Sequence, residues 1–279
     1  MISLRLQRGY TIVEVMIFLA VSAALFASAV AAINIQNRRN QFNQSVIEFE
    51  QRLSDLLNDV ETGYYPRGSN FTCQISGGRP QITPGTSQQG TNRDCIFIGR
   101  TIQFAPDELG PTGFNIYSIV GLRQGVNSAE AGNIEEAKPI ALDGEAGTII
   151  EQGILDSGVE IAKVFANPTG TSTNIETGGL AVLSGFGQTA SSGAGLESGF
   201  IRVALAIVPS TKVNQPKDQF ISAVQALTEE SINQAASGFV ICLQESGIGG
   251  RHATINVGTS GRLSVEKNID VWPEECKTT

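Results

Sequence analysis

The chain has 279 residues and a formal net charge of −8, with 31 glycines and only 6% aromatic residues. This length allows one large domain or two small ones besides a membrane segment, and the composition is typical of a β-rich exported domain with many turns. The acidic balance argues against broad binding of nucleic-acid phosphates, which needs clusters of Lys and Arg, so we expect no clear nucleic-acid site.

The first expected element is an apolar segment that follows a short basic leader, residues 1–9. From Val15 to Asn37, 23 consecutive residues carry no charge, and about 20 such residues in a helix cross the hydrocarbon core of a bilayer. Glu14 stands at the inner end of this run, where a charge costs roughly 2.5–3.5 kcal/mol, so we expect a partner for its carboxylate. The leader itself is too short and too charged for an ordinary secretory signal.

A partner for Glu14 would arise if a peptidase cut the chain after Gly9. Tyr10 would then be the new N-terminus, one helical turn from Glu14, and its α-amino group, with a reference pKa of about 7.7–8, would be largely cationic near neutral pH. The amine of the same chain, or that of a neighbouring subunit shifted along the helix axis, could pair with the carboxylate. This pairing would favour the packing of such helices side by side.

The segment Gly9, Tyr10-Thr11-Ile12-Val13-Glu14 and the apolar run that follows it resemble the processing motif of type IV pilins and type II secretion pseudopilins. The resemblance implies that a prepilin peptidase cuts after Gly9 and methylates the amine of Tyr10. It also implies that Glu14 pairs with the N-terminal amine of a neighbouring subunit in a filament. Family members most often have phenylalanine where this chain has Tyr10. Many major pilins have proline where this chain has Ala31, and the absence of that proline favours a minor pilin or a pseudopilin. The alternative is an ordinary signal anchor with a stray Glu.

The helix is expected to continue beyond the membrane surface. Apolar residues recur at steps of four and three, which marks one face of a helix: Phe42, Val46, Phe49, Leu53, Leu56, Leu57 and Val60. No Gly or Pro interrupts residues 10–62, and Gly63 provides a stop signal. One helix over this range would be roughly 80 Å long, with residues 10–36 as its transmembrane half and residues 37–62 as its amphipathic half. A pilin has this layout.

Residues 63–279 are predicted to form a β-rich extracellular domain, which gives an α+β, pilin-like fold with the long helix packed on an antiparallel β-sheet. Glycines and prolines predict a loop over 64–95, then a hairpin of strands 95–104 and 114–122 and an exposed connection over 123–147. Further strands are expected at 148–155, 159–165, 180–186 and 200–208, with a flexible glycine-rich loop over 185–199.

The last third of the chain is predicted to end in a β-meander. Residues 218–232 fit either a short helix or a strand, and we favour the helix. Strands over 238–244, 251–257 and 262–266 are separated by glycine turns and predict three antiparallel strands. This block loosely resembles the end of the GspH/FimT-type pseudopilin domain.

Four cysteines follow the membrane segment: Cys73, Cys95, Cys242 and Cys276. None forms a C-x-x-C pair, so the spacing of a zinc site is missing. An even number outside the membrane favours disulfides, and of the three connectivities we prefer the local pairs Cys73–Cys95 and Cys242–Cys276. Four buried free thiols are the alternative. Because Arg5 and Arg8 balance Arg38 and Arg39 across the membrane segment, the cysteines and the acidic body decide that the C-terminal domain lies outside.

Motifs for catalysis or metal binding are few. The single histidine, His252, is expected on a strand surface, and no nucleophile elbow or phosphate loop occurs. A calcium site built from loop carboxylates stays open as an alternative, but the sequence assigns no metal, no cofactor and no catalytic residue.

The resemblance therefore implies a structural subunit and not an enzyme. It would lie in the cytoplasmic membrane with a single pass and then join a cell-surface type IV pilus or a type II secretion pseudopilus. The implied partners are prepilin peptidase, other pilin or pseudopilin subunits, an inner-membrane assembly platform and the lipid bilayer. Two rival hypotheses remain. One is a filament-tip or membrane-anchored binding module for adhesion or DNA uptake that uses loops 64–94 and 185–199, and the other is a membrane-tethered enzyme.

Overall fold

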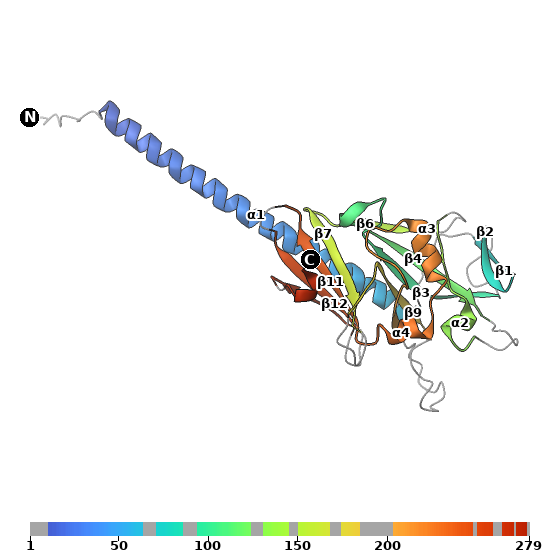
Figure 1. Cartoon of the computed structure of the whole chain (residues 1–279). Coiled ribbons are helices and arrows are strands. Elements are labelled where there is room, and N and C mark those ends of the chain that lie inside the picture. The colour runs from blue at the N-terminus through green and yellow to red at the C-terminus, as the bar shows by residue number, and fades with distance from the viewer. Residues whose placement is uncertain are drawn as a thin grey trace, which may run out of the picture.

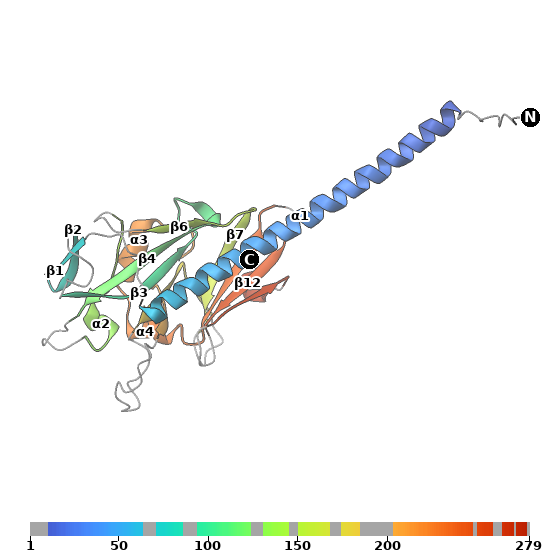
Figure 2. The ribbon, with the colours of Figure 1, turned by 180° about the vertical axis from the view of Figure 1, so that it is seen from behind.

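A computed structural model describes residues 11–63, 71–85, 94–123, 131–144, 150–167, 174–184, 203–247, 250–258, 264–270 and 272–277. One long helix runs into a body built from two larger antiparallel sheets and several short helices (Figure 1). The view from behind shows the second half of that helix lying along the body (Figure 2). The chain therefore has an α+β fold, as the sequence predicts.

Helix α1 (Ile12–Thr62) is continuous over 51 residues, which is about 77 Å at 1.5 Å per residue. It ends at the predicted stop, Gly63, whose backbone is left-handed with φ 67°, a conformation that glycine adopts without strain. Its buried face begins at Phe42 and contains all seven predicted apolar residues together with Ser45. The apolar face predicted from the steps of four and three is therefore buried, although it begins at Phe42 and not at residue 37.

The first sheet holds the predicted hairpin at its centre. Its strands follow one another in the order β10 (Val203–Ile207), β9 (Gly179–Ser184), β3 (Cys95–Phe104), β4 (Gly113–Leu122) and β5 (Ile140–Ala141), and β6 (Glu151–Ile154) also pairs with β4. Strands β3 and β4 join through a short turn, η1 (Gly110–Thr112), and their register shifts between Phe97 and Gly99.

The second sheet contains the predicted C-terminal meander, although its last strand continues to Ile269, beyond the predicted end at 266. Its strands follow one another in the order β13 (Val265–Ile269), β12 (His252–Val257), β11 (Phe239–Glu245), β7 (Val159–Ala166) and β8 (Ile175–Glu176). The buried face of α1 and the inner faces of both sheets form one apolar core. Burial of a large apolar side chain stabilises by about 1.5–3 kcal/mol, so this core fixes the helix to the body.

The opposite face of the first sheet packs against short helices and forms a second core. These are α2 (Ile134–Ala137), α3 (Lys217–Val224) and α4 (Glu229–Asn233), so the helix favoured over 218–232 is confirmed as two short ones. The ring of Tyr117 stacks on that of Phe220 with centroids 5.7 Å apart. The Tyr117 hydroxyl donates to Gln103 Oε1 at 2.8 Å, and burial raises the pKa of Tyr117.

Two predictions about connections were wrong. Within the predicted loop 64–95, β1 (Phe71–Ser76) and β2 (Arg79–Pro84) form a hairpin, because the left-handed Gly77 and Gly78 supply the two-residue turn that such a pair needs. The predicted exposed connection 123–147 contains α2 and β5 and buries four apolar residues: Ile134, Ala137, Ala141 and Leu142. Residues 64–70, 86–93 and 185–199 lie outside the described residues.

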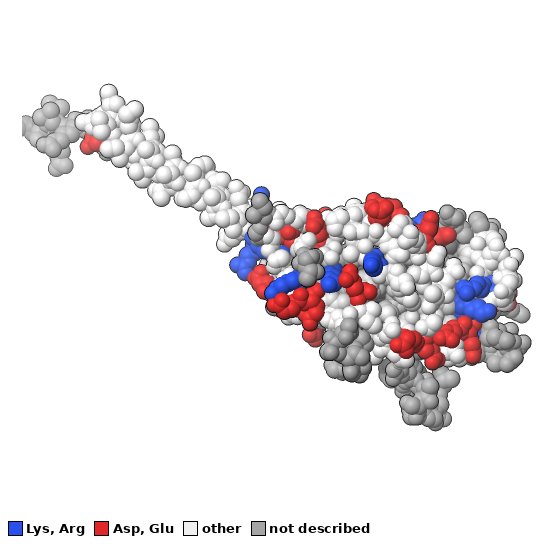
Figure 3. All heavy atoms as spheres, viewed as in Figure 1, with Lys and Arg blue, Asp and Glu red and all other residues white. Residues whose placement is uncertain are grey.

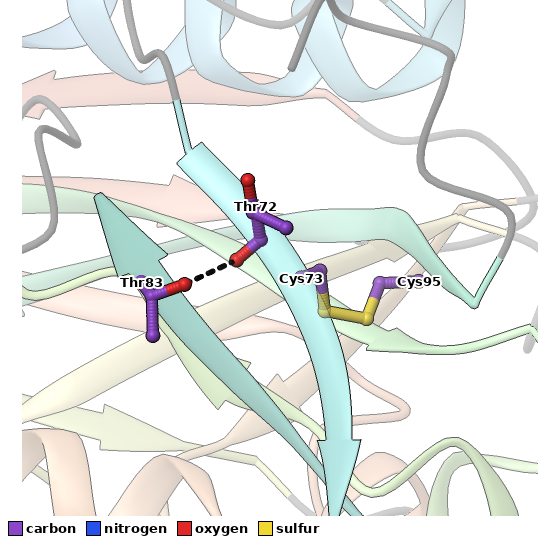
Figure 4. Close-up of a disulfide and its surroundings, with 4 residues drawn as sticks. All are labelled: Thr72, Cys73, Thr83 and Cys95. Carbon is purple, nitrogen blue, oxygen red and sulfur yellow. Dashed lines mark hydrogen bonds between the residues drawn. A yellow bond between two sulfur atoms is a disulfide. The ribbon is translucent and has the colours of Figure 1, made fainter. Parts of the chain in front are cut away.

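Both predicted disulfides are present. Cys73 of β1 is bonded to Cys95 at the start of β3, next to the contact in which the Thr83 hydroxyl donates to the Thr72 carbonyl oxygen at 3.4 Å (Figure 4). The second bond joins β11 to the C-terminal turn η2 (Glu274–Cys276). It holds the tail on the outer face of the second sheet.

Replacement of both Cys242 and Cys276 by alanine is expected to lower the free energy of unfolding by about 3–4 kcal/mol, because the bond closes a loop of 34 residues. Urea titration of the full chain in detergent micelles measures this loss. Trp272, the single tryptophan, packs beside this disulfide and reports the same release through its emission. The matched Cys73→Ala/Cys95→Ala variant should leave the emission of folded Trp272 unchanged. An unaltered unfolding midpoint in the first variant would contradict the prediction.

Candidate functional site at the N-terminal helix

The N-terminal half of α1 is an apolar surface that no other described element covers. Its large apolar side chains are exposed by 40–80%, with Ile12 at 80%, Phe26 at 72% and Phe18 at 71%. Figures 1 and 2 show this half leaving the body as a straight rod, and Figure 3 shows the rod without charged residues between its tip and the body. Residues 12–37 are called the free half of α1 below.

A surface of this kind needs an apolar environment. Contiguous apolar patches beyond a few hundred Å² mark membrane or protein contacts in soluble proteins, and each large side chain gains about 1.5–3 kcal/mol when it leaves water. Among the described residues, α1 is the one helix that is long and apolar enough to cross a membrane. The free half is therefore compatible with a single-pass membrane anchor.

The start of the free half is fixed by a reciprocal contact between Thr11 and Glu14. The backbone N–H of Glu14 donates to Thr11 Oγ1 at 3.3 Å, while Glu14 Oε2 accepts from the backbone N–H and the hydroxyl of Thr11 at 2.9 and 3.0 Å. This capping box satisfies backbone donors that a helix start leaves unpaired. Sequence reasoning missed the role of Thr11, although the spacing T-x-x-E is the signal for it.

The arrangement leaves the Glu14 carboxylate available to a cation. Both contacts from Thr11 use the same oxygen, Oε2, and the side chain is exposed. The carboxylate lies at the positive end of the helix dipole. The structure thus brings Glu14 to the tip of the rod, whereas Gly9 and Tyr10 lie outside the described residues. Cleavage after Gly9 and pairing with the Tyr10 amine stay predictions.

The other half of α1 is tied to the body by ion pairs around one buried arginine as well as by apolar contacts. Arg100 of β3 is only 3% exposed, and its Nη1 donates to Asp59 Oδ2 of α1 at 2.7 Å. Its Nη2 donates to the carboxylate of Glu151 in β6, which also accepts from Arg52 of α1 at 2.8 Å. Burial raises the pKa of Asp59 even though Arg100 opposes the shift. We call these four residues the charge cluster.

The charge cluster lies between α1 and the first sheet, and a second contact ties α1 to the other sheet. There, Lys267 of β13 pairs with Glu50 of α1. The rod and the body are therefore held together through both sheets. A force or a contact applied to the free half would reach the body without an intervening hinge in α1.

The predicted surface residue His252 is partly buried, and its ring lies against that of Trp272 with centroids 4.2 Å apart. Among the described residues, no group of three His, Cys, Asp or Glu side chains is placed to hold a metal ion.

Comparisons with protein-family models, with curated proteins and with solved structures found no match.

Proposed function

We propose that the protein is a prepilin-like structural subunit, a minor pilin or pseudopilin, that is assembled into a type IV pilus or a type II secretion pseudopilus. The observation that carries this proposal is the free half of α1, an exposed apolar rod that begins at an available carboxylate and continues without a break into the body. An apolar rod of this length can lie in lipid before assembly. It can equally lie against the rods of other subunits afterwards, because both surroundings remove it from water.

The proposed sequence of events starts in the cytoplasmic membrane with the body outside. Prepilin peptidase cuts after Gly9 and methylates the amine of Tyr10. An assembly platform in the inner membrane then brings subunits together, and Glu14 of one subunit pairs with the N-terminal amine of its neighbour. Removal of Arg5 and Arg8 with the leader takes two cations from a chain whose formal net charge is −8. The role of the body is structural, without a catalytic step.

N-terminal sequencing of the membrane-extracted protein tests the proposal. When the chain is co-expressed with a prepilin peptidase, we expect a start at N-methylated Tyr10, and a Gly9→Val variant should keep the leader. An intact leader in the parent chain would remove the basis of the proposal.

Incorporation into sheared filaments tests the assembly step. The Glu14→Ala variant should be inserted and stable but lost from filaments by at least ten-fold, because its tip no longer offers a carboxylate to the amine of a neighbour. Glu61, an exposed carboxylate near the other end of α1, provides the matched control, and Glu61→Ala should be incorporated normally. Equal incorporation of the two variants would contradict the role of Glu14.

A further inference from the structure

The end of the body nearest the free half of α1 carries guanidinium groups and the single indole. We call this end the proximal rim and define it by Arg38, Arg39, Arg251 and Trp272. Arg38 and Arg39 lie on α1, where the uncharged run ends. Arg251 precedes β12, and its Nη2 donates to the carbonyl oxygen of Ile35 at 3.4 Å. Trp272 lies against His252, the first residue of β12.

The length of the uncharged run sets the depth of the proximal rim. Val15 to Asn37 spans about 34 Å of helix, and the hydrocarbon core of a bilayer is about 30 Å thick. With Glu14 at one headgroup layer, Arg38 and Arg39 therefore lie at the other. Arg251 touches Ile35, which is still inside the uncharged run, so the body reaches down to the headgroups and does not stand away from them.

The guanidinium groups of the proximal rim have capacity for an anion. Arg38 has no ion-pair partner among the described residues, and the Arg39–Asp270 pair is long, at 3.8 Å, with both side chains about 60% exposed. Arg251 Nη1 is buried and has no hydrogen-bond partner in the described part of the chain, so the exposed capacity for an anion lies with Arg38 and Arg39. The nearby carboxylate of Glu245 accepts from the backbone N–H of Arg251 at 3.5 Å and not from its guanidinium.

Phosphate fits this arrangement better than a carboxylate of another protein would. The planar fork of a guanidinium matches two phosphate oxygens, and arginines at the end of a membrane helix extend toward the headgroups. Tryptophan is enriched at the same level of a bilayer because its ring is apolar and its N–H is polar. The arginines of the proximal rim, the ring of Trp272 and the end of the apolar run therefore all lie at the level of the lipid headgroups.

We propose that the proximal rim binds the phosphates of anionic phospholipids in the leaflet from which the body emerges. The body then rests on the membrane in a fixed orientation before assembly, with the second sheet beside the lipid surface. This inference rests on the membrane anchor of the proposed function. It adds a lipid class and the residues that select it.

Quenching of Trp272 by brominated lipids tests this inference on the full chain in vesicles of phosphatidylcholine. Equal fractions of brominated phosphatidylglycerol and brominated phosphatidylcholine are compared, and Trp272 is the only indole that reports. We expect the anionic lipid to bind more tightly by about five-fold for each arginine near the surface. The triple variant Arg38→Gln, Arg39→Gln, Arg251→Gln should bring the ratio of the two binding constants close to one. Raised salt should lower the ratio in the parent chain.

The control variant is Arg79→Gln, which removes one arginine from β2, at the end of the body opposite the free half of α1 (Figure 1). It should keep the full lipid preference. Equal quenching by the two lipids in the parent chain, or a preference that survives the triple variant, would overturn the inference. A change of Trp272 emission on addition of inorganic phosphate would assign the rim to a soluble anion. Self-association without lipid preference would assign it to a second copy of the chain.

Carbonate extraction of the same vesicles separates this inference from the proposed function. A chain that resists extraction but shows no lipid preference keeps its anchor and loses the lipid site. A chain that is extracted has no anchor, and both proposals fall. Cleavage after Gly9 is measured independently and is not changed by either result.

Discussion

Replacement of Phe49 by alanine is expected to lower the free energy of unfolding by about 3–5 kcal/mol. Phe49 lies on the buried face of α1 and is 1% exposed. Its ring meets that of Phe104 edge to face, with centroids 6.5 Å apart, and tilts toward that of Phe114 at 5.2 Å. Alanine would leave a cavity between the helix and both central strands of the first sheet, and a packed core closes such cavities only in part.

Urea titration of the full chain in detergent micelles, followed by Trp272 emission, measures this change. The same helix supplies the matched control, because Phe18 lies in the free half and is 71% exposed. Phe18→Ala removes the same atoms without opening a cavity and should shift the unfolding free energy of the body by less than about 0.5 kcal/mol. Similar losses of unfolding free energy in the two variants would contradict the prediction that Phe49 is packed in the core whereas Phe18 is not.

Local patterns predicted the elements whose residues are close in sequence. The helix face from Phe42 to Val60, the hairpin of β3 and β4, the meander of β11 to β13 and the local disulfides all follow from periodicity, glycine turns and cysteine spacing. The errors over 64–95 and 123–147 have one cause. Short elements of two to six residues among glycines and prolines carry too few side chains for a period to be visible, and tertiary packing stabilises them.

Only part of the candidate site could be predicted from the sequence, again because a local pattern shows only residues that are close in sequence. Glu14 stands out in sequence because its charge borders an apolar run, whereas the capping role of Thr11 needed attention to a spacing of three. Arg100 also interrupts an apolar strand, which signals a paired charge. Its partners Asp59 and Glu151 are 41 and 51 residues away. No local pattern could name them.

Replacement of Arg100 by methionine is expected to cost up to about 3–5 kcal/mol. It leaves the partly buried carboxylate of Asp59 without a cation and leaves Glu151 with only the half-exposed Arg52. The side chains of Asp59 and Glu151 are 25% and 22% exposed, so solvent replaces the cation only in part. The matched control is Arg52→Met, whose side chain is 47% exposed. It should cost less than about 1 kcal/mol. Urea titration at neutral pH measures both, and equal costs would contradict a central role for Arg100.

The stability that the Arg100→Met variant loses should depend on pH, and the pKa of Asp59 sets the direction of this dependence. Burial already raises the pKa of Asp59, so the folded chain binds this proton more readily than the unfolded chain does. The stability that this carboxyl group contributes is therefore largest at a pH below the ordinary pKa of Asp. It falls as the pH rises through the raised pKa of the folded chain. Without Arg100 the pKa rises further, so the deficit of the variant should be larger at neutral pH than in acid.

Removal of the stranded carboxylates should rescue the variant. Adding Asp59→Asn and Glu151→Gln to Arg100→Met replaces two partly buried charges by neutral groups, and removal of all partners of a buried ion pair is often nearly neutral. The triple variant should therefore regain most of the lost stability and lose the pH dependence, although Arg52 gives up its contact with Glu151. If the triple variant is as unstable as Arg100→Met, the packing of the arginine stem, and not its charge, holds α1 to the first sheet.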